Sequence, residues 1–156
     1  MRRSDKEVRL LEEMEEILGQ AQVCRLALND GGYPYIVPMN FGRGELGEGK
    51  KMLFFHSSPK GKKIELLEHD PRGAFQMDID TELVTAGEAC GFTMGYRSVC
   101  GRGRIRFLEN EGDKRYALNR IMSQYTGREN WDFPERMLKT VAVFALEIEE
   151  ITAKKS

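Results

Sequence analysis

The sequence has 156 residues, of which 24 are Lys or Arg and 25 are Asp or Glu, so the formal net charge is −1. This balance gives no overall attraction to nucleic acid or to an anionic membrane, and no apolar run is long enough to span a bilayer. The N-terminus lacks a signal-peptide core, and the three widely spaced cysteines fit neither a zinc site nor a disulfide framework. We therefore expect one domain, residues 1–156, with reduced thiols in the cytoplasm.

Residues 1–20 predict an N-terminal amphipathic helix. Ser4 and Glu7 form an S-x-x-E capping box, and apolar residues recur with the helical period from Val8 to Leu18. Gly19 is a suitable residue to end such a helix.

A β-hairpin is predicted next. Residues 22–28 alternate as a strand, and Asn29-Asp30-Gly31-Gly32 forms a tight turn because Gly and Asn tolerate positive φ. Residues 33–41 predict the returning strand, but its two prolines prevent regular pairing along the whole length. We expect an edge strand or a bulge at Pro38, with backbone groups left free for a ligand.

Two familiar motifs do not predict active sites here. Residues 42–51 contain G-x-G-x-x-G, but that motif must open a helix to bind a dinucleotide, and here a strand follows. Ser57 and Lys60 match the S-x-x-K of serine acylases, but no S-D-N or K-T-G accompanies them.

Residues 52–67 carry the main functional prediction, an anion site between a strand and a helix. An apolar strand, 52–55, turns through His56-Ser57-Ser58 into a helix with Pro59 at its first position and Ser58 as N-cap. The first turn carries three lysines, Lys60, Lys62 and Lys63. Positive charge there opposes the helix dipole, whereas a phosphate held by free amides and ammonium groups would explain it. The alternative is a solvated, lysine-rich helix start.

The remaining chain predicts further strands at 73–79, 96–108 and 140–148. Gly101 and Gly103 would let the second of these bend, as a barrel requires. A helix capped by Asn110 is expected to run to about Tyr125, and a charged tail is expected at 149–156. The segments 80–93 and 126–134, the latter carrying Trp131, are predicted to be loops.

About six strands joined mostly by hairpins, with three helices outside them, predict a mainly β fold built as a small antiparallel barrel. No internal repeat or low-complexity linker divides the chain.

Four blocks of this sequence resemble the nitroimidazole-resistance (Nim) proteins of the FMN-binding split-barrel group, which also contains pyridoxamine 5′-phosphate oxidase. The blocks are C-R-L-A-L-N-D-G-G-Y-P-Y-I-V-P-M-N-F, L-F-F-H-S-S-P-K-G-K-K-I-E-L-L, Y-R-S-V-C-G-R-G-R-I and V-A-V-F-A-L-E-I-E-E-I-T, between Val23 and Thr152. The resemblance implies an antiparallel six-stranded split β-barrel with peripheral helices, and a homodimer with FMN at the subunit interface. It also implies electron transfer from a reduced pyridine nucleotide or another donor, and nitroimidazole reduction in some members.

The same resemblance implies roles for individual residues. The backbone of Val37, Pro38, Met39 and Asn40 would line the flavin ring, with His56 and Ser57 beside it. The phosphate would lie at Ser58, Lys60, Lys62 and Lys63, with the grip resting more on Lys62 and Lys63 because Pro59 replaces a basic residue. Ser98 would reach the flavin from the partner subunit. The pyridoxal-binding residues have no clear counterparts, so vitamin B6 oxidation is not expected.

Several interpretations stay open. His56, with an ordinary pKa of ~6.5, could donate a proton, orient the flavin, or be a hydrogen-bonded edge histidine. Trp131 could cover the flavin or pin its loop, and Arg102, Arg104 and Arg106 could be solvated or lie at the dimer seam. We expect a flavin-dependent reductase of nitroimidazole-like or other small electrophiles; the alternatives are a non-catalytic flavin or haem carrier, with His56 as axial ligand, and a structural dimer with an empty cleft.

Overall fold

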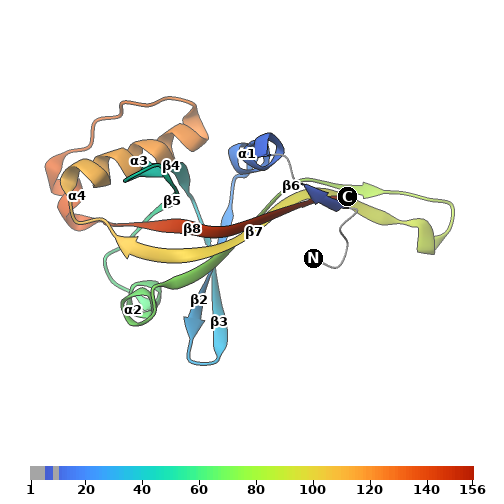
Figure 1. The fold of residues 1–156 in the computed structure, drawn as a ribbon, viewed down its shortest axis with the longest axis horizontal. Coiled ribbons are helices and arrows are strands. Elements are labelled where there is room, and N and C mark those ends of the chain that lie inside the picture. Colours follow the sequence, from blue (N-terminus) through green and yellow to red (C-terminus); the bar gives the residue numbers. More distant parts are fainter. Residues whose placement is uncertain (1–5, 9–10) are drawn as a thin grey trace.

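The computed structural model describes residues 6–8 and 11–156, which form one antiparallel sheet with helices around it (Figure 1). The strand order is β3-β2-β6-β7-β8-β5-β4, and β1 pairs with β8. The strands are β1 (Glu7–Val8), β2 (Cys24–Asp30), β3 (Tyr33–Met39), β4 (Gly42–Leu46), β5 (Lys50–Ser57), β6 (Arg72–Val84), β7 (Thr93–Phe107) and β8 (Ala142–Lys155). The helices are α1 (Leu11–Gln20), α2 (Lys62–His69), α3 (Glu111–Thr126) and α4 (Glu135–Thr140), with a 3₁₀ turn at Ala89–Gly91. The predicted antiparallel split barrel with peripheral helices is confirmed.

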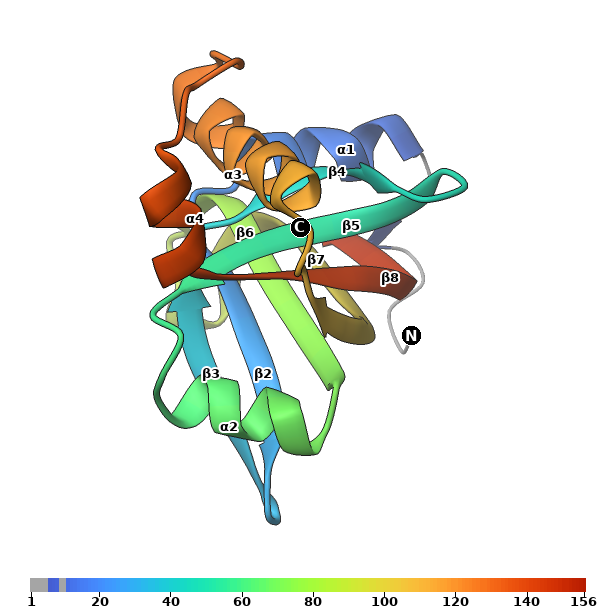
Figure 2. The ribbon, with the colours of Figure 1, turned by 90° about the vertical axis from the view of Figure 1, so that its left-hand side faces the viewer.

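Strand β5 separates two apolar cores because its continuous apolar run is buried on both faces. Leu53 and Phe55 point into the barrel, whereas Met52 and Phe54 face a second core beneath α3 and α4. Figure 2 shows these two helices on one side of β5, with α2 lying across the lower part of the barrel. The end of β5 therefore emerges between two packed regions, which fixes where His56 and Ser57 lie.

The predicted bend in the long strand is confirmed at Gly103. The register between β7 and β8 shifts between Arg102 and Gly103. A Cβ at Gly103 would lie 1.8 Å from the carbonyl oxygen of Glu147, so only glycine lets the two strands approach here. Among the described residues, no helix has the length and apolar character needed to cross a membrane.

The chain ends differ from the prediction. Glu7–Val8 is a strand paired with Lys154 and Ala153, so the first helix begins at Leu11, and Ser4 lies outside the described residues. Residues 149–155, predicted as a charged tail, continue β8. Their inward residues alternate with exposed charges, and this alternation was too polar to predict a strand.

Two more segments hold structure that the sequence analysis missed. Residues 42–46, predicted as part of a turn, form β4, in which Gly42 passes so close to α3 that a Cβ would lie 2.4 Å from the carbonyl carbon of Arg120. Residues 80–84 extend β6 and residue 93 begins β7, so the predicted 80–93 loop is the end of a projecting hairpin (Figure 1). The helix α4 was also missed. The sheet consequently has eight strands, whereas about six were predicted. The described chain has four α-helices, whereas three were predicted.

Candidate functional site

The pairing of β4 with β5 brings together two of the predicted flavin segments. Gly42 pairs with Phe54, so Asn40 and His56 each lie two residues beyond that pair, on the same side of it. Asn40 follows the edge strand β3, whose prolines are accommodated because β3 pairs only with β2. The predicted edge at Pro38 is therefore confirmed. The prediction that the prolines prevent regular pairing along the whole strand is wrong, because Tyr33–Met39 pairs with Cys24–Asp30 without a register shift or bulge.

The segment that follows Asn40 is anchored by α3. The backbone N–H of Phe41 donates to Oη of Tyr125 at 3.1 Å, and that hydroxyl donates to the carbonyl oxygen of Gln22 at 2.9 Å. The Phe41 side chain is fully buried. The backbone predicted to line a flavin ring is thus attached to the barrel core at one end.

Helix α2 begins later than predicted. Gly61 is its N-cap, with φ of 123°, and Lys62 is its first residue, so Ser58 is not the N-cap and Pro59 is not in the first turn. Ser58 Oγ accepts a long hydrogen bond of 3.4 Å from the Lys60 N–H within the loop. The helix starts at this point because glycine at position 61 can adopt a positive φ. A residue with a Cβ, such as serine, would be strained in that conformation.

The start of α2 has unsatisfied hydrogen-bond donors. No side chain caps the helix, and the first intrahelical acceptor, the carbonyl oxygen of Gly61, receives the N–H groups of Ile64 and Glu65. Within the described chain, the backbone N–H groups of Lys62 and Lys63 therefore have no acceptor. Such amides at a helix N-terminus are suited to an anion.

The three lysines of this region have different surroundings. Lys62 forms an ion pair with Asp30 at the tip of the β2–β3 hairpin, and its Nζ lies 5.4 Å from the centroid of the Tyr35 ring. The hydrogen bond from Lys62 to Asp30 raises the pKa of the lysine. Lys60 and Lys63 form no ion pair with a described residue. Two cations at the start of α2 are thus available to an external anion, and a third is shared with Asp30.

His56 lies beside Lys63. Burial, followed by the positive charge of Lys63, lowers the pKa of the imidazole below its ordinary value of 6.5. The imidazole is therefore mainly neutral at pH 7, and the ring makes no hydrogen bond to a described residue. No hydrogen bond of the imidazole supports the edge-histidine interpretation within the described chain, and all three interpretations of His56 remain predictions.

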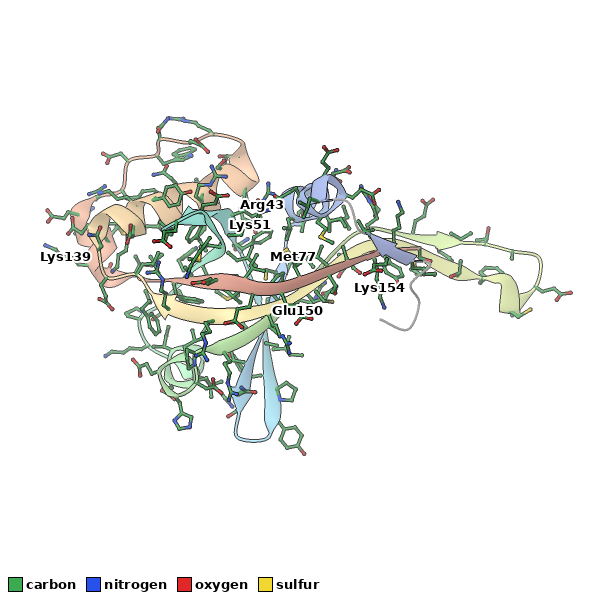
Figure 3. The ribbon with its side chains drawn as sticks, viewed as in Figure 1. Arg43, Lys51, Met77, Lys139, Glu150 and Lys154 are labelled. Atoms are coloured by element: carbon green, nitrogen blue, oxygen red, sulfur yellow. The ribbon has the colours of Figure 1, made fainter. Side chains whose placement is uncertain are left out.

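Ser98 lies elsewhere in the chain. It is on the outer face of β7, paired with Asp78 and Lys154, and it lines a cavity of about 490 Å³ with Tyr96, Cys100, Thr152 and Lys154. Figure 3 labels Lys154 near the base of the projecting β6–β7 hairpin, far from α2. The structure thus brings Asn40, His56 and the lysines into one region of the chain and leaves Ser98 in another.

Trp131 is held by its own loop and by α3. Its Nε1 donates to the carbonyl oxygen of Arg128 at 2.9 Å, and its backbone N–H donates to Oδ1 of Asn119 at 2.6 Å. The Arg128 guanidinium lies 4.3 Å from the indole centroid. In the described chain Trp131 therefore pins the 126–134 loop.

Sequence reasoning missed two residues of this region, Asp30 and Tyr35. They belong to the hairpin and lie about thirty positions from Lys62, so only the packing of α2 on β2 brings them to it. No signal within the sequence could have identified this pairing.

The sequence profile described as pyridoxamine 5′-phosphate oxidase matches residues 11–155, and the chain belongs to this family. Among solved structures, a candidate 5-nitroimidazole antibiotic resistance protein from Bacteroides thetaiotaomicron is 30% identical, with a TM-score of 0.81, 96% of this chain covered and 86% of that chain.

Two further structures have the same fold. The FAD and heme binding protein from Mycobacterium smegmatis is 21% identical, with a TM-score of 0.81 and coverage of 97% of this chain and 73% of that one. A FAD-binding protein from Mesorhizobium loti is 25% identical, with a TM-score of 0.65 and coverage of 94% and 95%. A search of curated proteins found no match.

Proposed function

We propose that the protein binds FMN and uses it as a flavin-dependent reductase of nitroimidazole-like or other small electrophiles. The observation that carries the proposal is the pair of unneutralised cations, Lys60 and Lys63, next to the free amides that begin α2. An anion there would be bound by charge-assisted hydrogen bonds and would satisfy donors that are otherwise left to solvent.

The donor set fits a terminal phosphate. A phosphate monoester presents three acceptor oxygens and up to two negative charges, and this region offers two backbone N–H groups and two free ammonium groups. Lys62 would add a third ammonium group, but it is held by Asp30. The phosphate would therefore be bound mainly by Lys60 and Lys63, with the hydroxyl groups of Ser57 and Ser58 as neighbouring donors.

The ring would lie against the backbone of Val37–Asn40 and the end of β5, because Asn40 links the end of β3 to β4, whose first residue, Gly42, pairs with Phe54. Ser98 is too far along the sheet to join them within one chain. We propose that Ser98 of the partner subunit completes the site in a homodimer, which would explain why the cavity at Ser98 faces outward from the sheet.

A bound flavin would supply electrons, obtained from a reduced pyridine nucleotide or another donor, to a small electrophile. The chain's own residues would hold the cofactor and manage the proton. Burial and then Lys63 lower the pKa of His56, which favours the neutral imidazole, so it would act as a hydrogen-bond donor through a ring N–H. A phosphate near Lys63 would offset that lysine's charge and raise the pKa of His56.

The relatives support this proposal. The protein from B. thetaiotaomicron is named for 5-nitroimidazole resistance, and the proteins from M. loti and M. smegmatis are named for FAD binding. The terminal phosphate of FMN fits this donor set better than the phosphate of FAD, which is linked to a second phosphate, so both cofactors belong in the test.

A second candidate is a haem or flavin carrier without turnover. It is favoured by the name of the M. smegmatis protein, which includes heme binding, and by His56, which is neutral and has no hydrogen-bond partner in the described chain. A neutral imidazole nitrogen is a suitable ligand for haem iron.

The visible spectrum of the purified protein is the decisive first measurement, followed by titration with FMN and FAD monitored by quenching of flavin fluorescence. About one flavin per chain supports the proposal and leads to assays of nitroimidazole reduction with NADH and NADPH. A Soret band would support the carrier instead. A protein that retains no chromophore after reconstitution would overturn the flavin site.

A further inference from the structure

The first residue of α2, Lys62, takes part in two different arrangements. Its backbone N–H is one of the free donors of the candidate anion site. Its side chain reaches the β2–β3 hairpin, where the ammonium group forms an ion pair with Asp30. Figure 2 shows this hairpin running past α2, with its tip beyond the helix. One residue therefore joins the candidate phosphate site to a distant segment of the chain.

The Asp30 carboxylate depends on Lys62 as its partner. Among the described residues, no second cation and no other side-chain donor bonds to it. The lysine side chain is 54% exposed and the aspartate side chain 33%. Ion pairs with this exposure contribute little to stability, because water and salt screen them. A more highly charged anion at the start of α2 can therefore displace Asp30 from Lys62.

The position of the Lys62 ammonium group leaves it near the proposed ligand. The group lies 5.4 Å from the centroid of the Tyr35 ring on β3. Val37 and Met39 follow Tyr35 at alternate positions, on the same face of this strand. These two residues belong to the stretch proposed to line the flavin ring. The flexible four-carbon stem of a lysine lets the ammonium group move from Asp30 to a phosphate without a change in the backbone.

The charges at this helix start differ with and without a ligand. Without Asp30, the ligand-free chain would carry three uncompensated ammonium groups within residues 60–63, next to the positive end of the helix dipole. Asp30 compensates one of them. A phosphate monoester offers Lys62 up to two negative charges and three acceptor oxygens. Charge-assisted bonds to such a group are stronger than an exposed lysine–carboxylate pair.

We propose that Asp30 competes within the chain with the bound phosphate for Lys62, and that Asp30 thereby weakens phosphate binding. The inference rests on the proposed function for the presence of a phosphate at the start of α2. Asp30 is a positioning residue, because it contacts the lysine and not the ligand. Phosphate binding requires the fraction of molecules in which Lys62 has left Asp30, so the apparent affinity is reduced by that fraction. Removing the carboxylate should therefore improve binding.

The variant Asp30→Asn removes the competing charge and keeps the turn, because Asn followed by Gly is a favourable turn pair. The ratio of the riboflavin Kd to the FMN Kd isolates the phosphate contribution, since the two flavins differ only in the phosphate. This ratio should rise ~3-fold or more in Asp30→Asn. The conservative variant Asp30→Glu should keep it within ~2-fold of the wild-type value. Fluorescence titration measures both constants. A ratio that is unchanged or lower in Asp30→Asn would overturn the inference.

Two controls separate release of Lys62 from a general change in charge. Glu65 lies in the first turn of α2, and its charge acts on Lys62 without a hydrogen bond. Glu65→Gln should change the ratio by less than ~2-fold, because exposed charges are screened. In a Lys62→Ala background, Asp30→Asn should have no further effect. An equal gain from Glu65→Gln, or a gain from Asp30→Asn that persists without Lys62, would overturn the inference.

Inorganic phosphate tests the inference without a flavin, through NMR shifts of the Lys62 and Lys63 amides. A chain that binds no flavin, but binds phosphate more tightly as Asp30→Asn, would overturn the proposed function and support this inference. A chain that prefers FMN to riboflavin, with no change in Asp30→Asn, would do the reverse. A chain that responds to neither ligand would overturn both. The melting temperature identifies a variant that fails to fold, in which case Asp30→Ser replaces Asp30→Asn.

Discussion

Helices α1 and α2 both lie against the sheet and both carry clustered charge. The charges of α1 are mostly neutralised by ion pairs, whereas those at the start of α2 are mostly not. Three of the four glutamates of α1 are paired with cations of the sheet: Glu13 with Lys155, Glu15 with Arg43 and Lys51, and Glu16 with Arg97. The hydrogen bond from Arg97 lowers the pKa of Glu16. At the start of α2, by contrast, Lys60 and Lys63 have no counter-charge in the described chain.

This difference distinguishes charges that attach a helix to the sheet from charges that are available to bind a ligand. The charges of α1 hold the helix to the sheet, so an added ligand would have to displace a partner that is already there. Lys60 and Lys63 are repelled by the positive end of the α2 dipole and form no ion pair. Their position is explained if an anion binds there. Four experiments test this contrast, and they follow from the largest expected effect to the smallest.

Replacing both free lysines should remove the cofactor without harming the fold. Lys60→Ala with Lys63→Ala is expected to weaken FMN binding by ~10²-fold or more, because charge-assisted hydrogen bonds to phosphate are lost. The melting temperature without FMN should hardly change. The matched control is Lys50→Ala with Lys51→Ala, whose ammonium groups are paired with Glu147 and Glu15; equal weakening by both variants would contradict the contrast. Fluorescence titration measures the affinity.

The start of α2 depends on glycine at position 61. Gly61→Ala should destabilise the protein by about 1–3 kcal/mol, because φ of 123° is strained for any residue with a Cβ. Space is not the cause, since nothing lies within 4 Å of the added carbon. Gly87→Ala also meets open space, but without positive φ, so urea unfolding should show little change for it. Similar losses for both variants would refute backbone strain as the reason.

The end of α1 depends on Gln124 of α3. Its Nε2 donates to the carbonyl oxygens of Leu18, Gly19 and Ala21 at 2.9–3.2 Å. Gln124→Ala should cost about 1–2 kcal/mol in the free energy of unfolding, because these acceptors lose their donor. FMN affinity should be retained, since α1 does not contribute to the proposed site. Gln20→Ala, which removes only an exposed bond to Glu16, is the control; loss of flavin binding with Gln124→Ala would link α1 to the site.

The smallest effect concerns the protonation of His56. Its pKa is lowered in the folded chain, so the unfolded chain binds the proton first as the pH falls below about 6.5. The free energy of unfolding should therefore decrease with falling pH from about 6.5 down to the folded pKa, and His56→Asn should lack that decrease. NMR titration should show the pKa rising when FMN binds. An unchanged pKa would mean that the phosphate does not lie near Lys63.

Local sequence signals predicted the elements that local forces determine. The Gly31-Gly32 hairpin has positive φ at both glycines, Asn110 caps α3 through the N–H groups of Gly112 and Asp113, and Gly103 permits the bend in β7. The lysines around α2 were found because they oppose a helix dipole, which is also a local argument.

What could not be predicted depends on contacts between distant segments. β1 is two residues long and exists only because β8 pairs with it. The strand character of 149–155 comes from pairing with β7, which overrides a polar sequence. The ion pair that engages Lys62 needs the hairpin tip at Asp30. Of the candidate site, the cluster of lysines around the start of α2 was predictable, and the division between free and engaged lysines was not.

Strand β8 has a further consequence for how the protein is made. It follows β5 and β7 in chain order, yet it lies between them in the sheet and also pairs with β1. While the chain is being synthesised, β5 and β7 have no strand between them until residues 142–155 have left the ribosome. Nascent chains therefore expose the apolar edges of both strands until β8 emerges, a period in which chaperones can act. Ribosome-profiling of chaperone engagement should show binding that ends only after β8 emerges.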